Sequence, residues 1–269
     1  MSRAIRARGL RYAYPNGHAA LDGVDLDVGR GERVAVLGPN GAGKTTLMLH
    51  LNGLLRATAG ALEVAGLDVG PKTLRELRAR VGLVFQDPDD QLFMGSVRED
   101  VAFGPLNLGL ARPEVERRVA EALAAVRMDD AAGRAPHELS MGERRRVAIA
   151  TVLAMDPALL VLDEPSASLD PRARRELLDV LERIPRTLLV VTHDLPFAAE
   201  LCERAVILSA GRVVADGSAE AVIGDAPLLA AHDLELPAGF RLDAIERRGP
   251  AAPGAAPARG VSSHAWDTA

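Results

Sequence analysis

The stretch Gly38-Pro39-Asn40-Gly41-Ala42-Gly43-Lys44-Thr45-Thr46 decides the fold of this chain. An apolar run at 33–37 precedes it and predicts a buried strand, and residues 47–51 follow it with helical spacing. Strand, glycine-rich loop and helix in this order predict a phosphate-binding loop, because the loop N–H groups can point at a polyphosphate at the positive end of the helix. We expect Lys44 to reach the β- and γ-phosphates and the Thr45 hydroxyl to ligate Mg²⁺.

The composition indicates a folded chain without bulk affinity for polyanions. Of 269 residues, 48% are hydrophobic and 26% are charged, as is usual for globular proteins, and the net charge is −5. This balance argues against nucleic acid or anionic lipid as a partner held by overall charge. Cys202 is the only cysteine, which excludes an intramolecular disulfide and a cysteine-based metal cluster. The sequence has no signal-peptide pattern and no run near the ~20 apolar residues of a membrane-spanning helix, so we expect any work at a membrane to go through a partner.

Hydrophobic patterning predicts strands in both halves of the chain and helices between them. Residues 3–37 alternate short apolar segments with turns, which predicts antiparallel strands leading into the strand at 33–37. From about 96 to 157 the spacing is helical, and the segment 114–128 carries its apolar residues on one face. Residues 204–215 predict two short strands around a turn, and about 218–248 a helical appendage. From Gly249 the chain is rich in Pro, Ala and Gly, and because this composition cannot build a core we expect disorder there.

Polar residues at the ends of three further predicted strands complete the candidate site. The strand at 158–162 ends in Asp163 and Glu164, and beside a phosphate loop Asp163 is expected to ligate Mg²⁺ and Glu164 to polarise the attacking water. Gln86 follows the strand at 81–85. Its amide could ligate Mg²⁺ or orient a water, although read alone it is an ordinary loop residue. His193 follows the strand at 187–191 and could bind the γ-phosphate, the alternative being a structural histidine.

Three more features are predicted near the site, and the first two each leave two interpretations open. Tyr14 lies at a predicted strand end upstream of the loop, where its ring could stack on a nucleobase or lie half-buried in the sheet. Ser140 and Glu143 have the spacing of a capping box, so a helix begins there with an end that could bind an anion or serve only as a cap. The arginines at 144–146 are expected to form a solvated helix face.

Taken as one ordered set, these motifs resemble the nucleotide-binding subunit of ATP-binding cassette (ABC) proteins over roughly residues 1–225. The set comprises the loop at 38–46, Gln86, Leu-Ser-Met-Gly-Glu at 139–143, Asp163-Glu164, the segment 166–170 and His193. The resemblance implies an α/β P-loop NTPase fold with a RecA-like core sheet, an antiparallel β subdomain and an inserted α-helical subdomain at about 87–157. Residues 226–248 would then be a C-terminal appendage and 249–269 a disordered tail.

The resemblance also implies roles for individual residues. The substrate is ATP with Mg²⁺, Tyr14 stacks on adenine, and Glu164 is the catalytic carboxylate, assisted by Lys44, Gln86 and the switch residue His193. Ser140 and Gly142 bind the γ-phosphate held by the other subunit of a head-to-tail dimer, and Asp170 belongs to the loop that communicates across it. Mg²⁺ is held by Thr45, Gln86 and Asp163.

A narrower resemblance rests on residues 85–109, which are similar to the ATPase subunit of energy-coupling factor importers. In that family this region contacts the coupling helices of a membrane scaffold subunit. The implied protein is an ATPase on the cytoplasmic face of the cell membrane, bound peripherally to integral scaffold and substrate-binding subunits, with no nucleic-acid partner. Cobalt or nickel is the first choice of cargo. The alternatives are vitamin uptake and a soluble ABC ATPase without a transport role.

The segment Leu-Ser-Met-Gly-Glu at 139–143, which matches the signature segment of the family, departs from the family pattern at two positions. Met141 stands where the family usually has Gly, and Glu143 where it usually has Gln. A carboxylate near a bound anion is unfavourable unless it is engaged in the capping box. Ser140, Gly142 and Glu164 are intact, so both sites of a homodimer could hydrolyse ATP.

Overall fold

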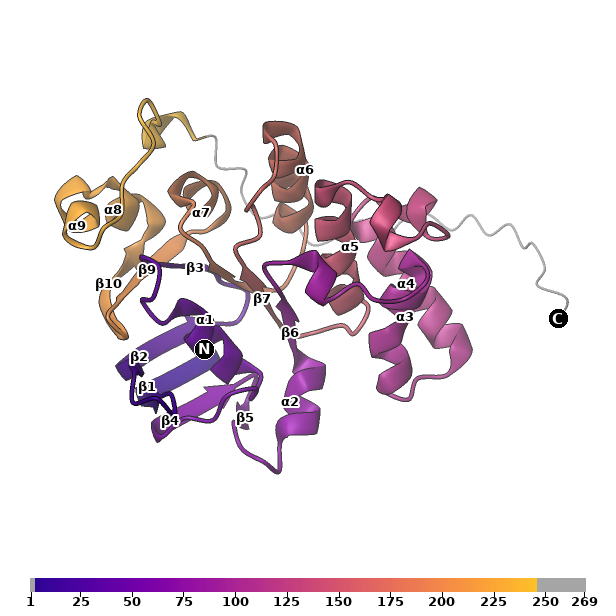
Figure 1. Ribbon diagram of the computed structural model, residues 1–269, viewed down its shortest axis with the longest axis horizontal. Helices are drawn as coiled ribbons and strands as arrows, with labels where there is room; N and C mark the ends of the chain where they lie inside the picture. Colours follow the sequence, from indigo (N-terminus) through magenta and orange to yellow (C-terminus); the bar gives the residue numbers. More distant parts are fainter. Residues whose placement is uncertain (1–2, 246–269) are drawn as a thin grey trace, which may run out of the picture.

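Two sheets and a block of helices make up residues 3–245, the part of the chain that the computed structural model describes (Figure 1). The first sheet is antiparallel, with strand order β2-β1-β4-β5. Its strands are β1 (Arg3–Ala13), β2 (Ala19–Gly29), β4 (Ala59–Val64) and β5 (Leu67–Asp68). The antiparallel strands predicted upstream of the phosphate loop are therefore confirmed.

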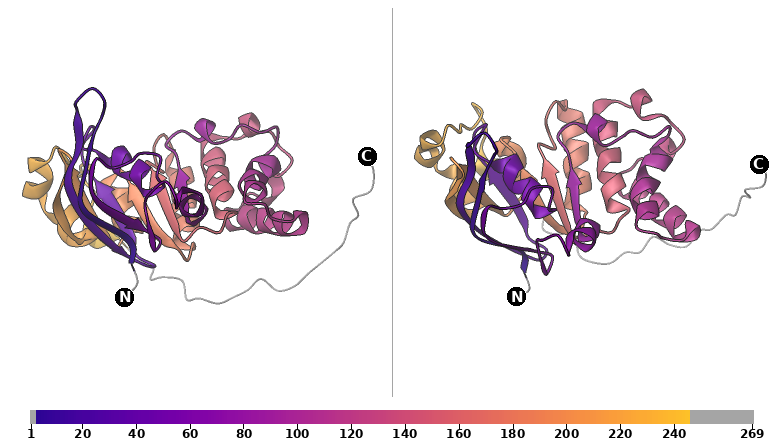
Figure 2. Two further views of the ribbon diagram at one scale, coloured as in Figure 1. Left: turned by 90° about the horizontal axis from the view of Figure 1, so that it is seen from below. Right: turned by 60° about the horizontal axis from the view of Figure 1, so that its bottom comes forward.

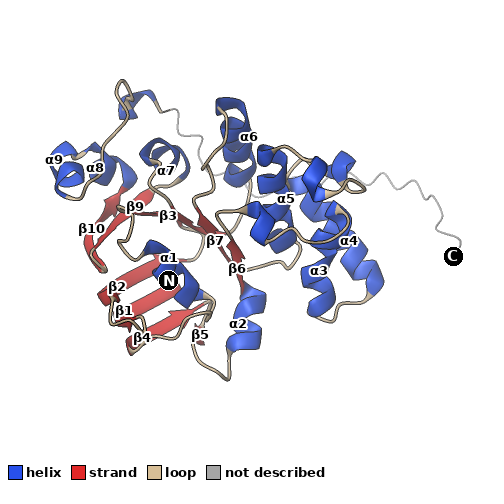
Figure 3. Cartoon of the chain, in the orientation of Figure 1, coloured by secondary structure: helices blue, strands red, loops and turns tan. Residues whose placement is uncertain are grey.

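The second sheet has the order β10-β9-β3-β8-β7-β6. Strand β10 is antiparallel to β9, and the other pairs are parallel. The strands are β3 (Arg33–Leu37), β6 (Val81–Val84), β7 (Leu159–Asp163), β8 (Thr187–Val191), β9 (Arg204–Ser209) and β10 (Arg212–Ser218). With helices on both sides (Figure 3), this mixed arrangement confirms the predicted α/β class.

Alternating residues of the central strands serve two different cores. In β3, Val34 and Val36 face the antiparallel sheet, whereas Ala35 and Leu37 face the other side. Helix α1 (Lys44–Leu51) supplies Leu47, Met48 and Leu51 to the first of these cores. Because buried parallel strands have apolar residues on both faces, the continuous run at 33–37 is explained. The apolar contacts of Leu47, Met48 and Leu51 hold α1 between the two sheets, directly after the glycine-rich loop.

Helices α5 (Met141–Leu153), α6 (Pro171–Glu182) and α7 (Leu195–Leu201) lie on the opposite face of the six-stranded sheet. Helices α3 (Val97–Asn107) and α4 (Arg112–Ala125) pack against α5 and against each other. Helices α3, α4 and α5 form the predicted helical block, which projects away from the antiparallel sheet (Figure 2). Helix α4 ends before the predicted 128, since Arg127 has a positive φ of 58°. Helix α2 (Leu74–Arg80), before β6, was not predicted.

The helical appendage predicted at about 218–248 contains two short helices and then a break, and its last three residues lie outside the described part of the chain. Helices α8 (Ala219–Gly224) and α9 (Ala226–Ala231) are followed by irregular chain, with a short 3-10 turn at Leu242–Ala244. Pro237 and Gly239 explain the break, because neither favours a helix interior. The other 3-10 turns are Pro88–Asp90, Asp129–Ala131 and Pro136–Glu138. The predicted disordered stretch, 249–269, lies outside the described residues.

Within residues 3–245, no helix combines the length and the hydropathy that crossing a membrane requires.

Candidate active site

The predicted site residues follow four neighbouring strands of the six-stranded sheet. Strands β3, β8, β7 and β6 are parallel neighbours, so their carboxyl ends share one edge. The loop at 38–46 follows β3, and His193 follows β8. Asp163 ends β7 with Glu164 directly after it, and Gln86 follows β6. A hollow of about 340 Å³ opens there, lined by Tyr14, His18, Ala20, the loop residues 40–46, Gln86, Asp163 and Glu164. One chain thus brings together most of the predicted site.

The loop itself needs glycine at two positions. Gly43 has a φ of 101°, and a Cβ there would collide with the carbonyl oxygen of Ala20; a Cβ at Gly38 would collide with the carbonyl oxygen of Leu208. Lys44 Nζ donates hydrogen bonds to the carbonyl oxygens of Gly38 (2.7 Å) and Pro39 (3.0 Å). Burial lowers the pKa of Lys44, and the charges of Glu164 and Asp163 oppose this shift. The amino group is therefore held inside the loop, beside the carboxylates.

Oxygen ligands of the type that Mg²⁺ prefers lie next to Lys44. The Thr45 hydroxyl lies 3.3 Å from Asp163 Oδ2. Burial raises the pKa of the Asp163 carboxyl to about 6, and the charge of Glu164 adds to the shift. A bound divalent cation would offset this burial and repulsion. Hydroxyl and carboxylate oxygens are hard donors, so Thr45 and Asp163 fit Mg²⁺.

Glu164 is held by Thr192 and His193, the two residues that directly follow β8. Its Oε2 accepts a hydrogen bond from the Thr192 hydroxyl at 2.8 Å, and its Oε1 lies 2.8 Å from His193 Nδ1 and 3.1 Å from the His193 backbone nitrogen. The residue has a φ of 44°, which is uncommon for a side-chain-bearing residue. Its N–H donates to the Val191 carbonyl at 2.8 Å. The carboxylate is thereby fixed at the hollow, and 64% of the His193 side chain remains exposed.

The capping box predicted at Ser140 is confirmed. Glu143 N–H donates to the Ser140 hydroxyl (3.3 Å), and the Glu143 carboxylate accepts from the Ser140 N–H (2.8 Å) while pairing with Arg134 at 3.3 Å. The hydrogen bond from the Ser140 N–H lowers the pKa of Glu143, against the effect of burial. Gly142 is buried, and a Cβ there would lie 2.8 Å from the Ala173 Cβ. Neither Ser140 nor Gly142 lines the hollow at the loop, so the structure does not bring them to that site within one chain.

Tyr14 is half-buried and also lines the hollow. Its hydroxyl lies 3.0 Å from the Thr46 hydroxyl. The ring meets that of Tyr12 edge-on, with centroids 5.0 Å apart, and lies nearly parallel to that of His18, with centroids 6.5 Å apart. The ring is therefore held beside the loop, at the hollow.

The prediction that the arginines at 144–146 form a solvated face is wrong, because each reaches a different segment of the chain. Arg144 pairs with Asp89 (2.9 Å) and Arg146 with Glu176 of α6 (2.8 Å). Arg145 is only 2% exposed. A long charged side chain can bury its methylene groups while its charged end binds acceptors. A run of arginines therefore does not by itself show that a helix face is exposed to solvent.

Sequence reasoning assigned no role to two residues of this region. Thr192 holds Glu164, and its position directly after a predicted core strand and before His193 was the available signal. His18 lines the hollow opposite Tyr14. No spacing pattern marks it, since it depends on the turn between β1 and β2.

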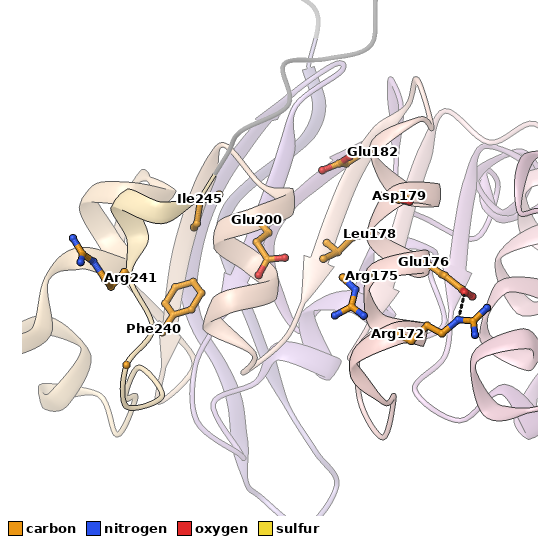
Figure 4. A pocket seen from close by; sticks show the side chains of 11 residues that line it. Arg172, Arg175, Glu176, Leu178, Asp179, Glu182, Glu200, Phe240, Arg241 and Ile245 are labelled. Atoms are coloured by element: carbon orange, nitrogen blue, oxygen red, sulfur yellow. Dashed lines mark hydrogen bonds and ion pairs between the residues drawn. The ribbon is translucent and has the colours of Figure 1, made fainter.

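A larger hollow lies elsewhere and contains none of the predicted site residues. It measures about 730 Å³ and is lined by charged residues of α6 and α7 and by the segment 239–245. Figure 4 shows Glu200 of α7 between the α6 side chains and Phe240. Arg172 pairs with Glu176 at 2.9 Å. Volume alone does not make it the active site, because the glycine-rich loop, Asp163 and Glu164 lie at the smaller hollow.

Comparison with known proteins gives the chain close relatives. Residues 21–167 match a family model described as ABC transporter. A Streptomyces avermitilis protein, named provisionally as an ABC transporter ATP-binding protein, is 61% identical over 88% of this chain and 90% of its own length. The energy-coupling factor transporter ATP-binding protein EcfA of Methanothermobacter thermautotrophicus is 47% identical (89% of this chain, 82% of the relative). The cobalt import ATP-binding protein CbiO of Rhodobacter capsulatus is 49% identical (88% and 86%).

Solved structures agree with these relatives. A CbiO1 of Clostridium perfringens, described as part of the ABC transporter complex cbiONQ, superposes with a TM-score of 0.78 at 36% identity, covering 88% of this chain and 97% of the other. A dimeric ATP-binding cassette bound to ADP and phosphate superposes with a TM-score of 0.72 at 27% identity, covering 80% and 98%. The predicted P-loop NTPase fold is thereby confirmed.

Proposed function

The chain belongs to the ABC transporter family as an ATPase subunit of the energy-coupling factor type, and from this premise we propose that it powers a membrane importer of cobalt or nickel ions. The observation that carries the catalytic part is the cluster at one sheet edge. There Lys44 lies inside the phosphate loop, the Thr45 hydroxyl lies 3.3 Å from Asp163, and Glu164 is held by Thr192 and His193.

The proposed chemistry uses these residues in place. The loop N–H groups and Lys44 bind the phosphates of ATP. Thr45, Asp163 and the Gln86 amide hold Mg²⁺, which when bound offsets the negative charge of the phosphates. Glu164 orients the attacking water and accepts its proton. His193 holds Glu164 through its ring nitrogen Nδ1, and the exposed part of the ring is open to the γ-phosphate. Tyr14 stacks on the base, as its position beside the loop allows.

We propose that two chains form the complete site. Ser140 and Gly142 do not line the hollow at the loop of their own chain, so a second chain would supply them. The relative solved as a nucleotide-bound dimer supports this arrangement. Because Glu143 is engaged in the capping box, its charge is directed at its own helix end. The partner is a second copy or a related cassette.

An exposed apolar patch supports a membrane scaffold as the other partner. Phe93 is 61% exposed, Phe103 is 42% exposed and Leu106 is 53% exposed. The two rings meet edge-on with centroids 5.0 Å apart. The patch lies on α3 and the loop before it, within the helical block. Contiguous exposed apolar surface marks interaction sites, so we assign it to the scaffold at the cytoplasmic face of the membrane.

The identity of the cargo is the most specific part of the proposal. It is supported by a relative named for cobalt import and by the structural similarity to CbiO1. The test is uptake of radiolabelled cobalt and nickel in cells that carry the wild-type chain, a deletion, or Glu164→Gln. We expect uptake only with the wild-type chain. If cobalt and nickel uptake is the same in the wild type, the deletion and Glu164→Gln, the proposed cargo is wrong. If vitamin uptake is lost in the deletion and in Glu164→Gln instead, the cargo is a vitamin.

A further inference from the structure

Arg145 joins three segments of the chain with one buried guanidinium group. It belongs to α5, the helix that begins at Ser140, and is 2% exposed. Its Nη1 donates to the carbonyl oxygens of Phe85 (3.2 Å) and Gln86, and its Nη2 donates to that of Ala167 (3.3 Å). The first acceptor belongs to the residue before Gln86 and the second to Gln86 itself, a predicted site residue. The third acceptor lies three residues after Glu164.

A second side chain ties the same segment to the same helix. Gln91 Oε1 accepts from the Phe85 N–H at 3.2 Å, and its Nε2 donates to the Ala148 carbonyl and the Thr151 hydroxyl, both at 2.7 Å. The residue before Gln86 is therefore bound to α5 through both its N–H and its C=O. Gln86 itself is exposed at the hollow, so its side chain stays free for a ligand while its backbone is fixed.

The third contact of Arg145 reaches the turn from Glu164 to Ala167. Ala167 N–H donates to the Glu164 carbonyl at 3.1 Å, which closes the turn that follows Glu164. Arg145 binds the carbonyl of this same Ala167. The guanidinium presents its donors on separate nitrogens in a fixed planar fork and so reaches acceptors on two sides, whereas the three donors of a lysine ammonium all radiate from one atom. Each acceptor is backbone, so the contact constrains where these segments lie.

We propose that Arg145 is a positioning residue that makes Gln86, the turn after Glu164 and the helix carrying Ser140 and Gly142 move as one unit. The inference rests on the proposed two-chain site. In that dimer, Gln86 and Glu164 face one ATP and Ser140 and Gly142 face the other. A displacement caused at one nucleotide is then passed through Arg145 to the second, so the two sites hydrolyse in step.

The test compares Arg145→Lys with Arg146→Lys, a matched change on the same helix whose partner, Glu176, lies on α6. We expect Arg145→Lys to lower kcat by roughly tenfold or more, because misplacing a catalytic group by about 1 Å can cost ~10²-fold. The Kd for a fluorescent ATP analogue should stay within about twofold, and Arg146→Lys should hold kcat within about twofold. An unchanged kcat in Arg145→Lys overturns the proposal. The proposal is also overturned if kcat falls in both variants and the fall in each is proportional to its decrease in Tm.

Hydrogen exchange on the wild-type chain supplies a second readout if Arg145→Lys does not fold. Addition of a non-hydrolysable ATP analogue should protect peptides covering 84–91, 164–170 and the start of α5 together. Protection of 84–91 and 164–170 without any response at α5 overturns the coupling. If the wild-type chain neither binds nor hydrolyses ATP, the proposed function fails first, and this outcome is distinct from a chain that hydrolyses ATP with uncoupled segments.

Discussion

Nδ1 of His193 lies 2.8 Å from Oε1 of Glu164, across the carboxyl ends of the neighbouring strands β8 and β7. The Glu164 side chain is 10% exposed and that of His193 is 64% exposed. The pair thus combines a shielded carboxylate with a ring open to a ligand. A change in the position of the His193 ring would therefore be transmitted to the Glu164 carboxylate, and under the proposed mechanism this links the γ-phosphate to the group that activates water.

Replacing Glu164 with Gln should separate binding from catalysis. The amide keeps the size of the side chain and an oxygen for the Thr192 hydroxyl, but it cannot accept a proton. We expect turnover to fall by roughly 10²–10⁴-fold, the usual contribution of a general base, with nucleotide affinity nearly unchanged. Steady-state hydrolysis and equilibrium nucleotide binding measure the two effects. Full hydrolytic activity in this variant would contradict the role of Glu164.

Replacing Lys44 with Ala should weaken nucleotide binding itself. A hydrogen bond to a charged group contributes about 1.5–3 kcal/mol, so we expect Kd to rise by at least ~10-fold. The chain offers a matched control, because Lys72 is the only other lysine and is exposed. Lys72→Ala should bind nucleotide like the wild type. Equal affinity in Lys44→Ala and Lys72→Ala would be evidence against the phosphate-loop role.

The capping box predicts a defined acid sensitivity. The pKa of Glu143 is lowered from 4.5, first by the hydrogen bond from the Ser140 N–H. Its contribution to folding stability is therefore fully present above about pH 4.5 and is lost as the pH falls through the folded pKa. Glu143→Ala should lower the free energy of unfolding by about 0.5–2 kcal/mol near pH 7. Chemical denaturation at several pH values should show this difference shrinking in acid; a constant difference would rule out the ionised cap.

The exposed aromatic pair should be required for the membrane partner and dispensable for chemistry. We expect Phe93→Ser combined with Phe103→Ser to weaken binding to the scaffold by more than about tenfold, since buried aromatic anchors dominate interface energies. Basal ATP hydrolysis should be preserved. Leu54→Ser is the control, because Leu54 is 50% exposed and lies outside the helical block. Equal loss of binding in both variants would contradict a specific docking surface.

Local patterns predicted that the candidate site residues lie at strand ends, because each motif carries its own geometry. A glycine-rich loop between strand and helix, and carboxylates at the end of an apolar run, lie at one edge once the strands are parallel. Contacts across the fold could not be predicted in this way. Arg145 was predicted to be exposed to solvent. This prediction failed because its acceptors are backbone groups 22 to 60 residues away, which no local pattern reveals. His18 and Thr192 likewise gain their positions from partners on other elements.

The most direct test of the central claim is to recover the tagged chain from gently solubilised native membranes, identify the subunits that accompany it, and assay their metal content. The account predicts a multi-helix scaffold together with a metal-binding membrane subunit that carries cobalt or nickel, and loss of both when Phe93 and Phe103 are replaced. Recovery of the chain only from the soluble fraction, with ribosomes, DNA or no partner, would contradict the transport function and leave the ATPase chemistry alone.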